Sequence, residues 1–452
     1  MFIHQIKSFY RSGHSRSILI KKNVAASFIF QGLSVLIQFA LVPLTLHYLN
    51  PIKFGIWITL SSFMLWFSFF DVGLSNGLKN KLSECIAKKE YDLAKTYIST
   101  TYALLAAIAT LLFFIFLIID YVIDWASVFH ATSEVAVELN KVIFWVFTFF
   151  LLKFVLSIIG TVFTADQKPA YVNYFSFLAN LLSLAIIFIV TKVTDNSLYH
   201  LGLWLSFPTV VVPLIASVYY FQTKLKHLSP SIAHIDSKKI KPLLSLGIYF
   251  FVSQLMTLII YSSDNMIILQ VLGPAEVTPY NIAFKYFSIV TILFGIAATP
   301  LWSAFTEAYS NNDFEWIRNA IKKFIRIWFL IIGGVAVMIV CSNYVYKIWI
   351  GNDVLISYHL TVSMGLFVIQ NTWVIIFTYF VAGVGKMRLV TIILIFAGLL
   401  NIPMSIYFAR SLHMGGTGVI AATILCLVPQ CIIIPIQYGK IMRGTANGIW
   451  SK

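Results

Sequence analysis

Two lysines and one aspartate lie inside long apolar stretches of this sequence, where a charged group is costly. Lys153 lies within 142–164, Lys285 within 280–306, and Asp264 within 244–269, between Ser263 and Asn265. A lysine at the centre of a membrane costs about 2.5–3.5 kcal/mol by insertion scales, so such side chains are expected to face protein or water. A buried ammonium suits an anionic ligand or a carboxylate partner, and a buried carboxylate suits a cation or a proton.

These charged residues leave specific alternatives open. Lys153 follows Lys141 by about 18 Å of helix, which places it near the midplane. There it either meets an anionic ligand or pairs with a carboxylate such as Asp71. Lys285 is near enough to the outer interface to snorkel, so a functional role and a solvated one are both open. Asp264 is either its structural partner or a cation or proton site.

A polar run, DVGLSNGLKNK at 71–81, follows the second apolar stretch of the sequence. If the helix continues through it, Asp71, Ser75 and Lys79 share one face, with Asn76 and Asn80 beside them. This stripe is expected to line a water-filled cavity open to the cytoplasm, and an ordinary solvated helix end is the alternative.

Composition identifies the elements that must position these residues. Hydrophobic residues make up 59% of the 452 residues and charged residues only 11%, compared with about 25% charged in soluble domains. So few charges cannot cover a soluble protein of this size. The four cysteines form no disulfide framework, and continuous apolar runs favour helices over a barrel. The fold class is therefore all-α, a polytopic membrane protein.

The apolar runs predict twelve transmembrane helices. They lie at 24–48, 54–82, 97–119, 142–164, 171–190, 201–221, 244–269, 280–306, 327–346, 360–384, 389–409 and 415–437. With both termini in the cytoplasm, 25 of the 32 Lys and Arg fall in inner segments and five in outer ones. The net charge of +15 is therefore mainly an orientation signal and not a nucleic-acid footprint.

The two halves of the chain resemble one another. A shift of 223 residues places Leu49-Asn50-Pro51 on Leu272-Gly273-Pro274 and Glu84 on Glu307 without a gap. A parallel repeat predicts a six-helix bundle at 1–221, a cytoplasmic linker at 222–242 and a second bundle at 243–452. Transporters built from such repeats bind substrate between the halves and alternate access by rocking them. Glu307 is expected to serve ion coupling or gating, with a solvated helix end as the alternative.

Enzymatic motifs are missing from the sequence. GVGK at 383–386 lacks the spacing of a phosphate loop, and the histidines and carboxylates form no catalytic or metal-binding pattern. We therefore expect no enzyme activity and no cofactor. Transport would then be driven by an H⁺ or Na⁺ gradient or by the downhill flux of the substrate.

The stretch FFDVGLSNGLKNKLSE at 69–84 resembles the O-antigen flippases, the polysaccharide-exporter branch of the multidrug/oligosaccharidyl-lipid/polysaccharide exporter superfamily. Looser support comes from Ser263-Asp264-Asn265, Leu272-Gly273-Pro274, the run from Tyr280 to Lys285 and GVGKMR at 383–388. The topology matches over essentially the whole chain, and the motifs over about a fifth of it.

This resemblance implies a flippase in the bacterial inner membrane. It would move undecaprenyl-diphosphate-linked oligosaccharide units, of O-antigen or capsule, from the cytoplasmic to the periplasmic leaflet. Related members carry a basic residue at the position of Lys285, in a cationic cavity, and allow Arg at the position of Lys79. Membrane lipid, the polysaccharide polymerase and the chain-length regulator are the expected partners. On this interpretation Lys153 and Lys285 contact the head group, and Asp71, Asn76 and Asn80 contact sugars. Lys79 and Lys81 capture the substrate at the inner mouth, and Asp264 serves as a counter-ion or in gating.

Two rival functions share the fold. An H⁺- or Na⁺-coupled multidrug antiporter would need a dominant buried carboxylate for cationic drugs, whereas here the intramembrane lysines and aspartates are balanced. A lipid II flippase usually has fourteen spans, and twelve argue against it. A membrane glycosyltransferase or polymerase would need a large outer loop or an acidic cluster, and this sequence has neither.

Overall fold

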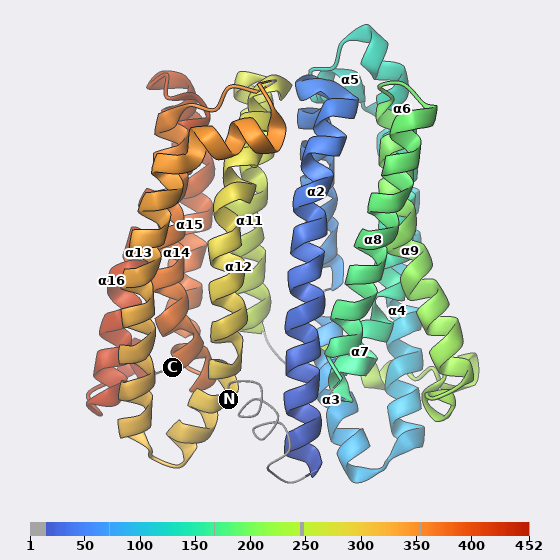
Figure 1. Ribbon diagram of the computed structural model, residues 1–452. Coiled ribbons are helices and arrows are strands. Elements are labelled where there is room, and N and C mark those ends of the chain that lie inside the picture. The colour runs from blue at the N-terminus through green and yellow to red at the C-terminus, as the bar shows by residue number, and fades with distance from the viewer. Residues whose placement is uncertain (1–14, 72, 167, 245–247, 353, 452) are drawn as a thin grey trace, which may run out of the picture. The chain divides into compact units, whose positions relative to one another are not determined.

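A computed structural model describes residues 15–71, 73–166, 168–244, 248–352 and 354–451, and in these ranges the regular structure is helical (Figure 1). Eleven helices of the described chain are long and apolar enough to cross a membrane. An apolar sequence favours helices there because a helix satisfies its own backbone hydrogen bonds without water. The all-α polytopic fold expected from composition is thus confirmed. The basic residues Lys7 and Arg11 lie outside the described residues.

The chain forms two compact units that interleave along the sequence. The first takes the described residues up to Leu49, Phe67–Ser127 and Thr132–Ile248, and the second takes Asn50–Trp66, Val128–Ala131 and the chain from Tyr249 onwards. The sequence predicts one boundary between two bundles, within 222–242. The contacts in the structure instead group residues 50–66 with the second unit. The linker 222–242 belongs to the first unit.

The first unit contains the first part of α2 and the elements up to α10. Their bounds are α2 Ser15–Trp66, η1 Phe67–Asp71, α3 Leu74–Lys88, α4 Tyr91–Val122, α5 Trp125–Val128, α6 Ser133–Leu156, α7 Ile158–Ala165, α8 Ala170–Val193, α9 Leu198–Gln222, η2 Lys226–Leu228, η3 Ile232–His234, η4 Ser237–Lys239 and α10 Ile240–Leu244. Within this unit α9 packs against α6 and α8, and α3 packs against α4 and α7.

The second unit contains the rest of α2 and the elements from α11 onwards. Their bounds are α11 Ile248–Leu272, α12 Pro274–Ser310, α13 Phe314–Ile350, α14 Tyr358–Gly383, α15 Arg388–Ile406, η5 Tyr407–Ser411, α16 Gly415–Met442 and η6 Gly448–Ser451. Within this unit α14 lies centrally and packs against α12, α13 and α16.

All twelve expected spans are found on these helices. The count is eleven because the first span and the first part of the second fall on α2, which is interrupted at Asn50 by a non-helical backbone (φ 68°, ψ 165°). The fourth span is also broken in part, since α6 ends before Ser157 and α7 begins after it.

The second span differs from the continuous helix that the sequence predicted. After α2 ends at Trp66, the chain passes through η1 and the left-handed Gly73 (φ 78°), and α3 begins at Leu74. An α-helix cannot continue through a left-handed residue. Asp71 is therefore not on one helix with Ser75 and Lys79, and the predicted stripe is wrong in this respect. Its repeat counterpart, α12, runs unbroken from Pro274 to Ser310.

Candidate functional site

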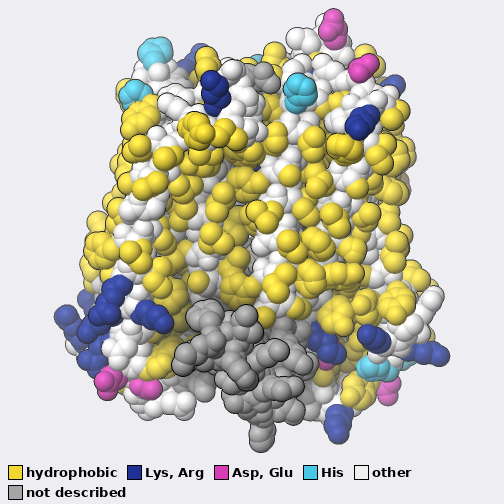
Figure 2. Space-filling view, in the orientation of Figure 1, with side chains coloured by type: hydrophobic (Ala, Val, Ile, Leu, Met, Phe, Trp, Pro, Cys, Tyr) yellow, Lys and Arg dark blue, Asp and Glu magenta, His cyan; other side chains and the backbone are white. Residues whose placement is uncertain are grey.

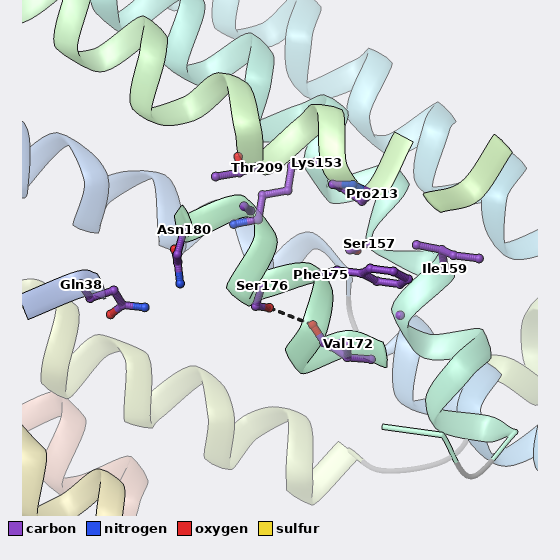
Figure 3. A pocket seen from close by; sticks show the side chains of 12 residues that line it. Gln38, Lys153, Ser157, Ile159, Val172, Phe175, Ser176, Asn180, Thr209 and Pro213 are labelled. Atoms are coloured by element: carbon purple, nitrogen blue, oxygen red, sulfur yellow. Dashed lines mark hydrogen bonds between the residues drawn. The ribbon is translucent and has the colours of Figure 1, made fainter. Parts of the chain in front are cut away.

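A cavity of about 340 Å³ lies inside the first unit, around Lys153 (Figure 3). Five helical segments contribute to its wall: the first part of α2, the end of α6, α7, α8 and α9. The lining residues are Gln38, Lys153, Ser157, Ile159, Gly160, Val172, Phe175, Ser176, Ala179, Asn180, Thr209 and Pro213. Six of the twelve have polar side chains, so the cavity combines apolar walls with hydrogen-bonding groups, as small-molecule sites do.

The local sequence opens space beside Lys153. Four residues after it, at Ser157, the regular helix is interrupted, and the Ser157 hydroxyl bonds back to the carbonyl of Phe154 at 2.7 Å. In α9, Pro213 has no N–H, so the carbonyl of Thr209 loses its usual helical partner. Breaks of this kind are tolerated in a membrane where the backbone lines a cavity.

The polar side chains of the cavity converge on one region. In Figure 3 the amino group of Lys153 points toward the side where Asn180 and Gln38 lie. Lys153 is exposed and forms no ion pair with a described carboxylate, so the alternative pairing with Asp71 does not occur in this structure. The twelve lining residues include no Asp or Glu. One cation beside two amides can bind an anionic group that also carries hydroxyls.

Gln38 and Asn180 are site residues that the sequence analysis missed. Each is one of two amides within its predicted span, Gln38 with Gln31 in 24–48 and Asn180 with Asn173 in 171–190. An amide in hydrocarbon is costly unless it finds a partner or water, so the same argument that singled out Lys153 could have found them.

The residues predicted at the inner mouth lie on or just before α3. Asp71 accepts hydrogen bonds from the Ser75 amide and hydroxyl, both at 3.1 Å, and so caps the start of α3. Asn76, Lys79 and Asn80 are exposed. Lys81 instead pairs with Glu84, at 3.3 Å, which reduces its availability to a ligand.

Glu84 is shared between two lysines at the exposed end of α3. Lys88 donates to it at 2.8 Å and Lys81 at 3.3 Å. The bond from Lys88, followed by the bond from Lys81, holds the pKa of the Glu84 carboxyl below its ordinary value.

Asp264 lies in a separate polar cluster in the second unit. It is buried and accepts a 2.5 Å hydrogen bond from the Tyr280 hydroxyl, while its other oxygen has no hydrogen-bond partner. Beside it, Asn281 donates to Asn265 and Asn265 donates to Ser62, each at 2.6 Å. The cluster thus joins α11, α12 and the 50–66 segment.

Lys285 does not pair with Asp264 in this structure. It is half-buried on α12 and forms no ion pair with a described carboxylate. The pairing of Lys285 with Asp264 that the sequence suggested is therefore wrong here. The Asp264 carboxylate instead accepts a hydrogen bond from Tyr280, which lies five residues before Lys285 on α12. Glu307 lies in the last turns of α12, and its side chain is outside the described residues.

The fold is shared with membrane transporters of known structure. An inward-facing multidrug resistance MATE family transporter of the MOP superfamily superposes with a TM-score of 0.78 at 13% identity, covering 94% of this chain and all of that one. A MOP superfamily transporter from Pyrococcus furiosus, described as having a pocket of reversed polarity, gives 0.66 at 14% identity, covering 95% of this chain and 97% of that one. The structural comparison therefore shows a polytopic helical membrane fold that this chain shares with these transporters.

Sequence comparison then gives the family. Residues 20–308, more than half of the chain, match the model described as polysaccharide biosynthesis protein, and the chain belongs to this family. A Salmonella typhi protein named as an inferred O-antigen transporter is 24% identical over 86% of this chain and 88% of its own length. A Yersinia pseudotuberculosis protein named as an inferred O-antigen export protein is 22% identical over 78% and 81%.

Proposed function

We propose that this protein is a flippase for undecaprenyl-diphosphate-linked oligosaccharide units of O-antigen or capsule. It moves them from the cytoplasmic to the periplasmic leaflet of the bacterial inner membrane by alternating access. The observation that carries the proposal is the cavity of the first unit, where a lysine faces two amides and no carboxylate lines the wall. A diphosphate attached to sugars needs this combination of charge and hydrogen-bonding groups. Membership of the polysaccharide biosynthesis protein family supports the same substrate class.

Each predicted residue has a role in this proposal. Lys153 and Lys285 contact the anionic head group. Lys79 and Lys81 capture it at the end of the protein where lysine and arginine are most frequent. We call this the basic end, and its excess of lysine and arginine orients it toward the cytoplasm. Asn76 and Asn80 are exposed beside Lys79, where their amides can bind sugar hydroxyls. Asp71 contributes indirectly, because its carboxylate also holds the start of α3.

Asp264 and Glu307 are assigned to ion coupling or gating. The buried Asp264 oxygen without a hydrogen-bond partner is the feature that supports a cation or proton at this position. The same feature favours the second candidate function, an H⁺- or Na⁺-coupled multidrug antiporter. The cavity around Lys153 argues against that candidate, because its only charged lining residue is a cation, which would repel a cationic drug.

Complementation tests the proposal. The chain is expressed in a bacterial strain that lacks its own O-antigen flippase, and surface polysaccharide is read on a gel with drug resistance scored in the same cells. We expect wild type to restore polysaccharide, Lys153→Ala to lose it, and Lys153→Arg to retain more than Lys153→Ala because the charge persists. Drug resistance without polysaccharide would favour the antiporter. Full transport by both Lys153→Ala and Lys285→Ala at wild-type expression would exclude the cationic-cavity mechanism.

A further inference from the structure

One face of α13 carries four basic residues at its N-terminal end. We call Arg318, Lys322, Lys323 and Arg326 the α13 basic stripe; all four are exposed. Arg318, Lys322 and Arg326 recur every four residues, so they lie above one another on the helix surface. None forms an ion pair with a carboxylate in the described part of the chain. Figure 2 shows lysine and arginine side chains gathered at the basic end of the second unit.

The same face continues as an exposed, mainly apolar surface. Leu330 follows Arg326 by one turn and is 76% exposed, and Val337 and Tyr344 follow at 62% and 71%. These residues belong to a helix that is long and apolar enough to span the membrane. The α13 basic stripe therefore lies where the apolar surface ends, at the depth of the lipid head groups.

The internal repeat identifies the equivalent surface on α4, and there it is covered. A shift of 223 residues places Lys322 and Lys323 on Ser99 and Thr100 of α4. The register is supported by the buried faces, because Ala94 and its equivalent Ile317 are both 0% exposed. The two copies thus present equivalent helix surfaces.

In the first unit this surface is occupied by the protein itself. The amide of Ser231 donates to the Ser99 hydroxyl and that of Asp236 to the Thr100 hydroxyl, both at 3.0 Å. Ser99 and Thr100 are consequently only 3% and 2% exposed. The corresponding surface of α13 is charged and exposed, so the polar segment that covers α4 has no described equivalent there.

We propose that the α13 basic stripe binds the head group of an anionic phospholipid in the leaflet at the basic end of the protein. A phosphate can accept hydrogen bonds from two adjacent side chains of the stripe, while the acyl chains follow the apolar face of α13. An acidic protein segment would satisfy the charges but not the uninterrupted apolar surface beyond Arg326. The site is distinct from the cavity around Lys153, and the proposal does not depend on the transported substrate.

Lipid binding to the full chain tests this inference. The protein, purified in a nonionic detergent, is titrated with phosphatidylglycerol or phosphatidylcholine, and bound lipids are counted by native mass spectrometry. We expect wild type to prefer phosphatidylglycerol, and the preference to weaken as the salt concentration rises. One Lys or Arg beside an anionic lipid strengthens binding about fivefold, so Arg318→Gln/Lys322→Gln/Arg326→Gln should weaken phosphatidylglycerol binding on the order of 100-fold.

A second triple variant provides the matched control. Lys224→Gln/Lys226→Gln/Lys238→Gln removes the same charge from exposed positions of the first unit, and it should retain wild-type lipid binding. Equal loss in both triple variants, or no preference of wild type for phosphatidylglycerol, would overturn the proposal. As a measurement that needs no variant, a photoactivatable phosphatidylglycerol head group should label wild type within 314–330. Labelling confined to other segments would also overturn it.

Discussion

Thr278 donates a 2.6 Å hydrogen bond to the carbonyl of Pro51, 227 residues away along the chain. Thr278 lies on α12 and Pro51 is the second residue of the 50–66 segment. The repeat places Pro51 on Pro274 and Gly55 on Thr278. In the reciprocal contact, Gly55 faces the carbonyl of Pro274 so closely that an added Cβ would lie 2.0 Å from its oxygen. The two equivalent helices therefore pack through one polar contact and one close backbone contact.

Gly55→Ala should destabilise the second unit. The added methyl group meets a backbone carbonyl that cannot rotate away, and overpacking of this kind costs about 1–3 kcal/mol. Thermal unfolding of the purified protein should show a lower midpoint. Gly334→Ala on α13 is the matched control, because nothing lies within 4 Å of its added Cβ. Equal midpoints for both variants would contradict this close contact.

Tyr280→Phe should destabilise the protein by about 1–3 kcal/mol, because the buried Asp264 carboxyl loses its one hydrogen-bond donor. The double variant Asp264→Leu/Tyr280→Phe should recover much of this loss, since it removes both polar partners together. Thermal unfolding measures the structural effect. If Asp264 also couples or gates transport, the double variant will be stable yet inactive in the complementation assay. A single variant with wild-type stability would show that the bond contributes little.

Lys79→Gln should impair transport more than Lys81→Gln. Lys79 is exposed and forms no ion pair with a described carboxylate, whereas Glu84 already pairs with Lys81. The pKa of Glu84 is lowered, so this carboxyl stays ionised as pH falls through the ordinary range for glutamate, and its pairing is lost only below its lowered pKa. The difference between the variants should therefore persist as pH falls from neutral to the ordinary glutamate pKa of 4.5.

Initial uptake rates in inverted membrane vesicles measure this difference. Loss of one charge-assisted bond predicts a reduction of about tenfold or more for Lys79→Gln. Glu84→Gln should not reduce transport, because it releases Lys81. If Lys81→Gln lowers the uptake rate more than Lys79→Gln does, capture by Lys79 would be contradicted.

Much of the fold could be predicted from the sequence. The transmembrane helices follow from local hydropathy, and the equivalence of the two halves follows from the register of the repeat. The buried faces of α4 and α13 agree at equivalent positions, as Ile98 and Ile321 show with 0% and 3% exposure. The interruption of the second span was not predicted, although Gly73 could have indicated it. A glycine is compatible with several backbone conformations, and the left-handed conformation of Gly73 is found only in the structure.

Two charged residues of the candidate site could be predicted from the sequence, but the residues that they contact could not. Lys153 and Asp264 were identified from the cost of charge in a membrane. Their surroundings depend on which helices meet, and this is decided by packing between segments far apart in the chain. Asp264 thus bonds to Tyr280 instead of Lys285, and Lys153 lies beside Gln38 from α2 instead of a carboxylate.

The cavity amides should determine which glycan is carried, while Lys153 should matter for any diphosphate-linked substrate. Gln38→Leu and Asn180→Leu keep the cation and remove hydrogen-bonding groups that line the cavity. Loss of a neutral hydrogen bond predicts a threefold to tenfold decrease, on the order of 0.5–1.5 kcal/mol per bond. Surface polysaccharide should be compared in strains that make two different repeat units.

The expected pattern is unequal loss between the two glycans for the amide variants and similar loss for Lys153→Ala. Ile159→Leu, a volume-conserving change in the same wall, is the control and should leave both glycans unaffected. The amount of each variant in the membrane is measured alongside, so that export is compared at equal expression. Wild-type export of both glycans by both amide variants would mean that the sugars are recognised elsewhere in the protein.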